Sequence, residues 1–352
     1  SYLERISING QSIDAKELIF SFNDLSPYLD LMDTKFENPI SFFEAMTALA
    51  FVAFAEHPID VGVIEVGMGG LWDATNVVKS DVAVITNIAL DHMEFAGPTL
   101  QHIAHEKVGI SKANSSLVIG DENPELFPIW NESLHAKLIR RGEDFELNEN
   151  QLAVGGRSLS VRTSRASYSD IHLPLHGIHQ GSNASIALAA VEEFFDAALN
   201  IEIVREGLAS VLMPGRFEVL GRQPLVIVDG AHNPAGADVC AEVFFDDFSP
   251  EGKRILVVGT LKGRDPEQLL SALRVDEFDA VICCTAPTAR GLSAGELGDV
   301  ARRMGCDEVV ICDTVENACE KAINMATEED AVLVAGSLYV VGSARTLLRR
   351  IL

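Results

Sequence analysis

The stretch that decides the fold is Leu225-Val-Ile-Val-Asp-Gly-Ala-His-Asn-Pro234. Its apolar start predicts a buried strand, and its proline predicts a helix over 235–245, because proline is favoured at the first helical position. Asp229 and His232 are therefore expected between the carboxyl end of a strand and the N-terminus of a helix. Open α/β sheets bind ligands at such a point, and exposed N–H groups there bind anions. An asparagine–proline turn with a capping aspartate is the structural alternative.

Downstream of this stretch, apolar runs alternate with helical segments. Continuous apolar strands separated by helices are typical of a parallel sheet covered on both faces. We therefore predict an α/β domain over residues 213–352, joined to the rest of the chain by a hinge at 213–215. Its expected strands are 224–229, 254–259, 280–284, 308–312 and 330–335.

Residues 1–212 are also predicted to be α/β, with a less regular pattern. The expected elements are a helix over 42–56, buried strands over 61–65 and 82–86, a helix over 101–112, a small antiparallel sheet within 140–175 and a helix over 182–195. Two domains agree with a length of 352 residues, since domains typically contain about 150 residues.

The composition excludes several classes of function. With 27 basic and 52 acidic residues the net charge is -25, which argues against nucleic acid as a partner because binding it requires a basic face. No segment reaches the ~18 consecutive apolar residues of a membrane span, and no signal peptide is visible. The six cysteines lack zinc-site spacing and are expected to be reduced. These features predict a cytoplasmic enzyme without a membrane partner.

Two polar motifs follow the expected strands of the first domain. Glu65 precedes a glycine-rich turn, and a carboxylate there suits magnesium, which takes one or two carboxylates together with phosphate oxygens. His92 follows the strand over 82–86 and could bind the same metal, with Asp91 orienting its ring. An ordinary glycine turn and an ordinary polar histidine are the alternatives.

Two further motifs lie on expected helices. Lys107 follows Glu106 on the helix over 101–112, where the pair is either on the solvated face or near metal and phosphates. Gln180 and Asn183 begin the helix over 182–195, where they either cap it or bind a base or substrate.

Six motifs, taken together and in this order, resemble a known family. They are Glu-Val-Gly-Met-Gly-Gly-x-x-Asp-Ala-Thr-Asn (65–76), Ile-Ala-Leu-Asp-His (88–92), Glu-Lys-x-Gly-Ile (106–110), Gly-x-His-Gln-x-x-Asn-Ala (177–184), Pro-Gly-Arg-Phe-Glu (214–218) and Asp-Gly-Ala-His-Asn-Pro (229–234). The set resembles the folylpolyglutamate synthase/dihydrofolate synthase branch of the Mur ligase family.

This resemblance implies a fold and a reaction. The fold is a Mur-ligase-type ATPase domain followed by a Rossmann-like α/β domain, with ATP bound between them and Mg²⁺ as the metal. In the reaction, ATP phosphorylates a carboxylate of folate or dihydropteroate, and the amine of L-glutamate attacks the acyl phosphate and displaces phosphate. Metal and cations would stabilise the transition state. We expect these small molecules as the only partners of a monomer.

The resemblance also implies roles for individual residues. Glu65 and His92 match magnesium ligands, and Lys107 matches a lysine that is often carbamylated. Asn183 matches a residue near the adenine, and Gln180 matches a neighbouring residue of the site. From the second domain, Arg216 matches an arginine that reaches the ATP phosphates, Asp229 a ribose contact, and His232 a residue near the phosphates and the reacting centre.

Two departures from the family pattern bear on activity. The chain contains no Gly-x-x-Gly-Lys-Gly-Ser loop, which cradles phosphates through its backbone N–H groups; the ATPase domain is thus expected to be N-terminally truncated. Leu71 and Trp72 stand where the family commonly has arginine and a variable residue. We therefore expect little or no ligase activity from this chain alone. There are two alternatives: another Mur-type amide ligase, and an inactive remnant that binds nucleotide or folate.

Overall fold

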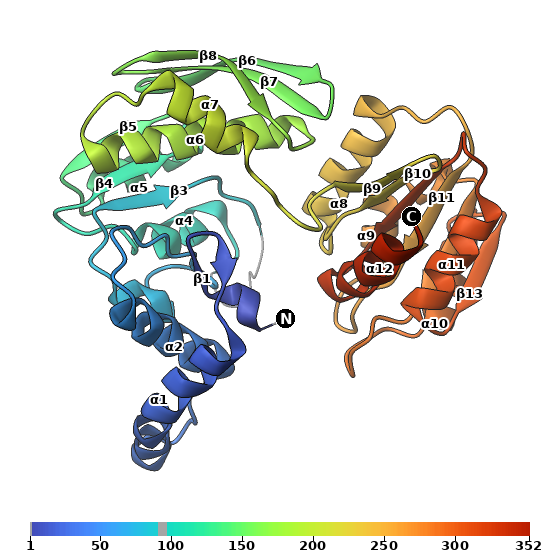
Figure 1. Ribbon diagram of the computed structural model, residues 1–352, viewed down its shortest axis with the longest axis horizontal. Helices are drawn as coiled ribbons and strands as arrows, with labels where there is room; N and C mark the ends of the chain where they lie inside the picture. Colours follow the sequence, from blue (N-terminus) through green and yellow to red (C-terminus); the bar gives the residue numbers. More distant parts are fainter. Residues whose placement is uncertain (1, 91–96) are drawn as a thin grey trace. The chain divides into compact units, whose positions relative to one another are not determined.

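The computed structural model describes residues 2–90 and 97–352, which form two compact units. The smaller unit comprises Ser1–Phe145 with Ala189–Asp196, and the larger comprises Glu146–Leu188 with Ala197–Leu352. Figure 1 colours the chain along its sequence, from blue at the N-terminus to red at the C-terminus. The hinge over 213–215 and the domain boundary at 213 stay predictions.

A short parallel sheet forms the centre of the smaller unit. Its strand order is β3-β4-β5, and its core gathers around the fully buried Trp130. The strand predicted over 82–86 is confirmed, whereas the helix predicted over 101–112 ends earlier, with Gly109 as its C-cap. The elements are β3 (Val82–Ile85), α4 (Leu100–Val108), β4 (Ser116–Ile119), η3 (Pro124–Leu126), α5 (Phe127–Glu132) and β5 (Lys137–Arg140).

Two helices precede this sheet, and each begins with a capping box. In this motif the side chain of the N-cap residue accepts a hydrogen bond from the backbone N–H of the third helical residue, and the side chain of that residue accepts one from the backbone N–H of the N-cap residue. Asp14 and Glu17 cap the first, and Ser41 and Glu44 cap the second, which is the helix predicted over 42–56. The elements here are η1 (Leu3–Arg5), β1 (Ser7–Ile8), β2 (Gln11–Ser12), α1 (Ala15–Lys35), α2 (Phe42–Glu56) and η2 (Ala74–Val77).

The buried strand predicted over 61–65 is wrong. Residues 61–66 have no regular secondary structure, and Val63 is 92% exposed. A strand requires a hydrogen-bonded neighbour as well as an apolar sequence, and among the described residues β3 pairs only with β4. Glu65 therefore lies on an exposed, irregular segment rather than at the end of a strand.

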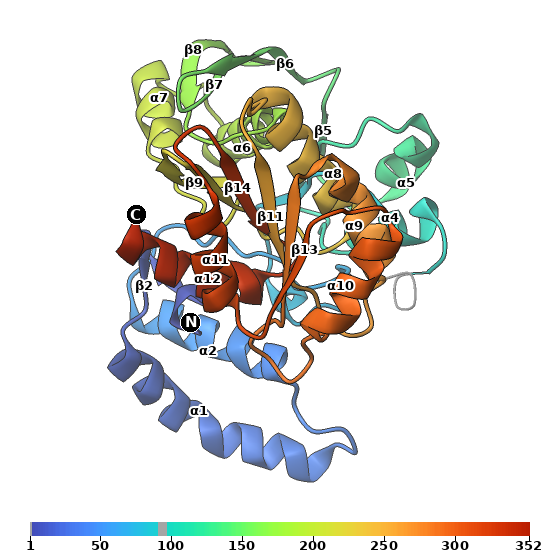
Figure 2. The same cartoon turned by 90° about the vertical axis from the view of Figure 1, so that its right-hand side faces the viewer.

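The larger unit contains a mainly parallel sheet with the order β13-β12-β11-β14-β10-β9. Helices α8, α9 and α10 pack on one face and α11 and α12 on the other, as in a doubly wound fold (Figure 2). All five predicted strands are confirmed; the antiparallel edge strand β9 was not predicted. The strands are β9 (Glu218–Arg222), β10 (Leu225–Val228), β11 (Arg254–Val258), β12 (Ala280–Cys284), β13 (Val309–Cys312) and β14 (Ala331–Ala335).

The helices of this sheet begin with side-chain caps. Asn233 caps α8 by accepting a hydrogen bond from Gly236 N–H at 2.8 Å, and Pro234 is the first helical residue, as predicted. The helix predicted over 235–245 becomes π-helical after Glu242. The elements are α8 (Pro234–Glu242), η4 (Val243–Asp247), α9 (Pro266–Ala272), η5 (Val275–Glu277), α10 (Ala294–Arg303), α11 (Val315–Met325) and α12 (Leu338–Ile351).

A second sheet of the larger unit is antiparallel, as predicted for the polar region. It has the order β6-β7-β8, and its strand residues Leu159 and Tyr168 share a core with the helix residue Leu188. The elements are β6 (Phe145–Ala153), β7 (Gly156–Thr163), β8 (Ser167–Leu173), α6 (Ile178–Phe195) and α7 (Ile201–Ala209); Phe145 and the part of α6 from Ala189 onward are assigned to the smaller unit.

The glycine-rich turn of the smaller unit packs directly on the end of α4. Leu71 N–H donates to the carbonyl of Glu106 at 2.9 Å. A Cβ atom on Gly70 would lie 2.7 Å from the carbonyl oxygens of both Glu106 and Lys107. Only glycine allows this approach, so the turn and the lysine are held side by side by backbone contact.

Gly70→Ala is expected to destabilise the smaller unit by about 1–3 kcal/mol, because the added methyl group meets backbone rather than a movable side chain. Gly62→Ala is the matched control, since its Cβ would meet only ordinary contacts at 3.9 Å; its effect should stay within about 0.5 kcal/mol. Denaturant unfolding of both variants checks this. Equal stability of the two would contradict the packing argument.

Candidate functional site

A half-buried carboxylate organises the turn that follows β10. Asp229 Oδ2 accepts a hydrogen bond from Phe217 N–H at 2.7 Å, and Oδ1 accepts one from Ala231 N–H at 2.8 Å. Burial raises the pKa of Asp229, while these two N–H groups and the charges of Arg216 and His179 act to lower it. Asp229 thus joins the turn after β10 to the turn before β9.

The second of these turns contains Arg216. Gly230 N–H donates to the carbonyl of Gly215 at 2.8 Å, which adds a second backbone link between the turns. Gly215 and Phe217 both have positive φ, +71° and +43°. A non-glycine residue with positive φ is uncommon and is held by its surroundings. The arginine between them is exposed, and its side chain makes no hydrogen bond or ion pair with the described residues.

His232 is half-buried in the turn before α8. Its Nδ1 lies 2.9 Å from the carbonyl oxygen of Gly230. Since a carbonyl can only accept, Nδ1 carries the proton. Nε2 makes no hydrogen bond within the described parts of the chain, so it can interact with a ligand.

The start of α6 belongs to the same unit. The side chain of Asn183 donates to that of Gln180 at 3.3 Å, so these two predicted site residues meet. Neighbouring His179 interacts with the charges of Asp229 and Arg216, and burial lowers its pKa. The start of α6 therefore lies near the two linked turns.

A buried polar cluster supports this end of α6. Asn150 donates to the carbonyl of Ile178 at 2.8 Å and accepts from Arg157 Nε. Arg157 is 3% exposed and forms an ion pair with Asp247 at 3.0 Å. Sequence reasoning missed all three polar residues, because they belong to no motif and lie far apart along the chain.

An open pocket of about 510 Å³ lies beside the Arg216 turn. This volume is within the range of small-molecule sites. Apolar residues such as Leu175 and Phe248 line it together with charged ones. The charged lining residues are Arg216, Glu218, Arg222, Asp247, Arg345 and Arg349. Arginines are thus concentrated here in a chain with a strongly negative net charge.

In the smaller unit, Lys107 is half-buried and lies at the end of α4 beside the glycine-rich turn. Glu65 is exposed. Neither side chain forms a hydrogen bond or ion pair with the described residues. His92 and Asp91 lie outside the described residues. Among the rest, no group of three or more His, Cys, Asp or Glu side chains could hold a metal.

The predicted site residues therefore fall into two groups. The larger unit holds Arg216, Asp229 and His232 in the two linked turns and Gln180 and Asn183 at the start of α6, whereas Glu65 and Lys107 belong to the smaller unit. A missed residue of the smaller unit is Asp121, which accepts hydrogen bonds from Ile88 N–H at 2.8 Å and Asn123 N–H at 2.9 Å. Its position directly after β4 was the available signal.

All six cysteines are free thiols, and burial raises the pKa of Cys283 and Cys319 to about 12. Within the described ranges, no helix is long and apolar enough to cross a membrane.

Both halves of the chain match known families. Residues 20–191 match the Mur ligase middle domain, and residues 215–338 match the family described as Mur ligase, glutamate ligase domain. The dihydrofolate synthase/folylpolyglutamate synthase of Mycobacterium tuberculosis is 36% identical over 386 residues, which cover 99% of this chain and 78% of that protein.

Solved structures agree with these matches. Mycobacterium tuberculosis folylpolyglutamate synthase complexed with ADP and AMPPCP superimposes with a TM-score of 0.90 at 36% identity, over 98% of this chain and 82% of that one. A bifunctional folylpolyglutamate synthase/dihydrofolate synthase with Mn, AMPPNP and L-glutamate bound gives a TM-score of 0.83 at 29% identity, over 100% of this chain and 80% of that one. The chain therefore belongs to the Mur ligase family, in its folylpolyglutamate synthase/dihydrofolate synthase branch.

Proposed function

We propose that this protein is an ATP-dependent ligase that joins L-glutamate to a carboxylate of folate or dihydropteroate. The observation that carries the proposal is the pair of linked turns around Asp229, which present an exposed arginine and a histidine with a free Nε2. Relatives over nearly the whole chain carry the names of this activity, and related structures hold ADP, AMPPCP or AMPPNP.

In this proposal the larger unit binds the nucleotide. Arg216 reaches the phosphates, for which its unpaired guanidinium is suited by charge and by its fork of donors. Asn183 and Gln180 lie near the adenine. Both oxygens of Asp229 already accept backbone hydrogen bonds, so a ribose hydroxyl would use a remaining lone pair.

The reaction consists of two transfers. A substrate carboxylate oxygen attacks the γ-phosphorus of ATP, ADP leaves, and an acyl phosphate remains. The amine of glutamate then attacks the acyl carbon, and inorganic phosphate leaves as the amide bond forms. In this scheme Arg216 stabilises the negative charge that develops on the transferred phosphoryl group. His232 would do the same with both ring nitrogens protonated, because Nε2 then donates a hydrogen bond.

Mg²⁺ is the metal we propose, with Glu65 and His92 as protein ligands. The exposed Glu65 carboxylate has no partner among the described residues, so its oxygens fit a hard cation. When bound, the metal would neutralise phosphate charge. Lys107, which is held beside the glycine-rich turn, would add a further anionic group there if carbamylated.

Two general properties belong to the same proposal. We infer a monomer in the cytoplasm, with small molecules as partners. Other amide ligases of the Mur type remain the second candidate, because the two matching families are described by the name Mur ligase. A remnant that binds nucleotide without turnover is the third candidate.

Phosphate release distinguishes these candidates. The full-length product of the encoding gene is assayed with ATP, glutamate and either dihydropteroate or tetrahydrofolate, and in parallel with UDP-muramyl substrates. We expect release that depends on the pterin substrate and on glutamate. Release with the UDP-muramyl substrates alone would reject the folate activity, and nucleotide binding without any release would favour the remnant.

Arg216→Ala in that protein should raise the KM for ATP by about tenfold or more, because a charge-assisted bond to phosphate contributes about 1.5–3 kcal/mol. Arg222→Ala is the matched control: this arginine is also exposed and lines the same pocket. Initial rates across ATP concentrations provide the comparison. A larger effect of the control would show that the assignment of Arg216 is mistaken.

A further inference from the structure

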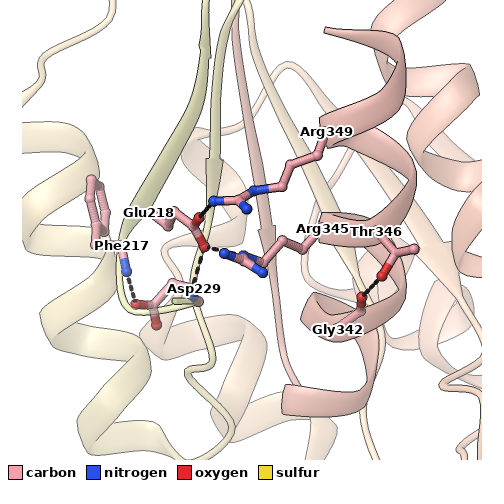
Figure 3. A network of polar contacts seen from close by, with 8 residues as sticks. Phe217, Glu218, Asp229, Gly342, Arg345, Thr346 and Arg349 are labelled. Atoms are coloured by element: carbon pink, nitrogen blue, oxygen red, sulfur yellow. Dashed lines mark hydrogen bonds and ion pairs between the residues drawn. The ribbon is translucent and has the colours of Figure 1, made fainter. Parts of the chain in front are cut away.

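Glu218 is the meeting point of the Arg216 turn and the last helix of the chain. Its Oε2 accepts a hydrogen bond from Arg345 Nε at 2.7 Å and another from Gly215 N–H at 2.8 Å. Its Oε1 accepts from Arg349 Nη2 at 3.0 Å. Figure 3 shows both arginines reaching this carboxylate from α12. One side chain therefore satisfies a turn amide and two guanidinium groups.

The Glu218 carboxylate lies where β9 begins beside the end of β10. Glu218 is the first residue of β9 and pairs with Val228, the last residue of β10, directly before Asp229. Burial acts to raise the pKa of Glu218, but the hydrogen bonds from Arg345 and Gly215 and the charges of both arginines hold it below its ordinary value. The carboxylate is thus ionised at neutral pH, and its hydrogen bonds are charge-assisted.

Helix α12 also packs on the turn through its side chains. A Cβ on Gly215 would lie 2.8 Å from Val341 Cγ1, and one on Gly230 would lie 2.5 Å from Leu338 Cδ2. The helix therefore contacts both linked turns, and the glycines allow its close approach. Arg345 and Arg349, one helical turn apart, add the polar part of the same contact.

The residues before and after Arg216 are each held by hydrogen bonds of their own. Gly215 is held by Glu218 and by Gly230, and Phe217 is held by Asp229. The residues at both ends have left-handed backbone angles, which must be maintained by such contacts. Arg216 itself contributes no side-chain bond to this arrangement, so its direction is set by its neighbours.

We propose that Glu218 is a positioning residue: it ties Gly215 to Arg345 and Arg349 of α12 and thereby holds Arg216 in the orientation in which it meets its ligand. The nature of that ligand, a nucleotide phosphate, rests on the proposed function; the holding of the turn does not. The C-terminal helix thus becomes part of the support of the site.

Amide hydrogen exchange of this chain tests the holding of the turn without reference to activity. In Glu218→Ala the amide of Gly215 should exchange at least about tenfold faster, because it loses a bond to a charged acceptor. Phe217 and Gly230 amides, whose acceptors remain, should also exchange faster, since the turn moves as a unit. Glu218→Gln keeps an acceptor for Gly215 but loses the charge, so its effect should be intermediate.

Glu316→Gln is the matched control. Glu316 is an exposed carboxylate that accepts a hydrogen bond from Ser343 of α12 but does not contact the turn. Its substitution should leave the three amides unchanged. Unchanged exchange in Glu218→Ala would overturn the proposal. The proposal would also be overturned if exchange accelerated equally at the amides of β11 and β12 in both Glu218 variants, because this would indicate general destabilisation.

Binding of MgADP to the same variants tests whether Glu218 acts through Arg216. Glu218→Ala should weaken binding to the same extent as Arg216→Ala, and the double variant should be no weaker than Arg216→Ala alone, because the two changes remove one interaction. If the losses of MgADP binding in the two single variants add up in the double variant, Glu218 does not act through Arg216. If the unaltered chain does not bind MgADP, the proposed binding of a nucleotide by the linked turns fails, while the exchange result still decides the role of Glu218.

Discussion

The hydrogen bonds that the Asp229 carboxylate accepts from Phe217 N–H and Ala231 N–H are the interaction on which the candidate site depends. The first bond closes the turn before β9 onto the end of β10, and the second shapes the turn that leads to His232. Without an acceptor between them, two buried N–H groups would lose their partners, at a cost of about 1–3 kcal/mol each. The aspartate is therefore a structural element first, and any contact with a ligand uses what remains of its acceptor capacity.

The position of this carboxylate follows from the architecture of the larger unit. Strands β10, β11, β12 and β14 are buried and parallel, so their carboxyl ends meet at one edge of the sheet. An open α/β sheet binds ligands outside that edge. The antiparallel β9 brings the Arg216 turn to the same edge, and the cap of α8 presents helix N–H groups there. Sheet, turn and helix thus converge on one small region from three separate parts of the sequence.

Local patterns predicted much of this fold, and tertiary pairing explains the rest. Strand β12 was predictable because its five residues form a continuous apolar run. In the structure all five are buried. Residues 61–64 are also mostly apolar in sequence, but they lie mostly exposed and no neighbouring strand pairs with them among the described residues, so the strand predicted over 61–65 is wrong. Strand β9 was missed because Gly221 and Arg222 interrupt its apolar pattern. The motifs located the two linked turns, yet not the contact of Glu218 with Arg345, which are 127 residues apart.

We infer that the linked turns around Asp229 bind a nucleotide. A titration of the isotopically labelled chain with MgADP, followed by amide chemical shifts, tests this inference and detects even millimolar affinity. We expect saturable shifts that are largest at residues 215–217 and 230–233, with further shifts at 180–183. Shifts confined to other parts of the chain, or none at millimolar nucleotide, would contradict it.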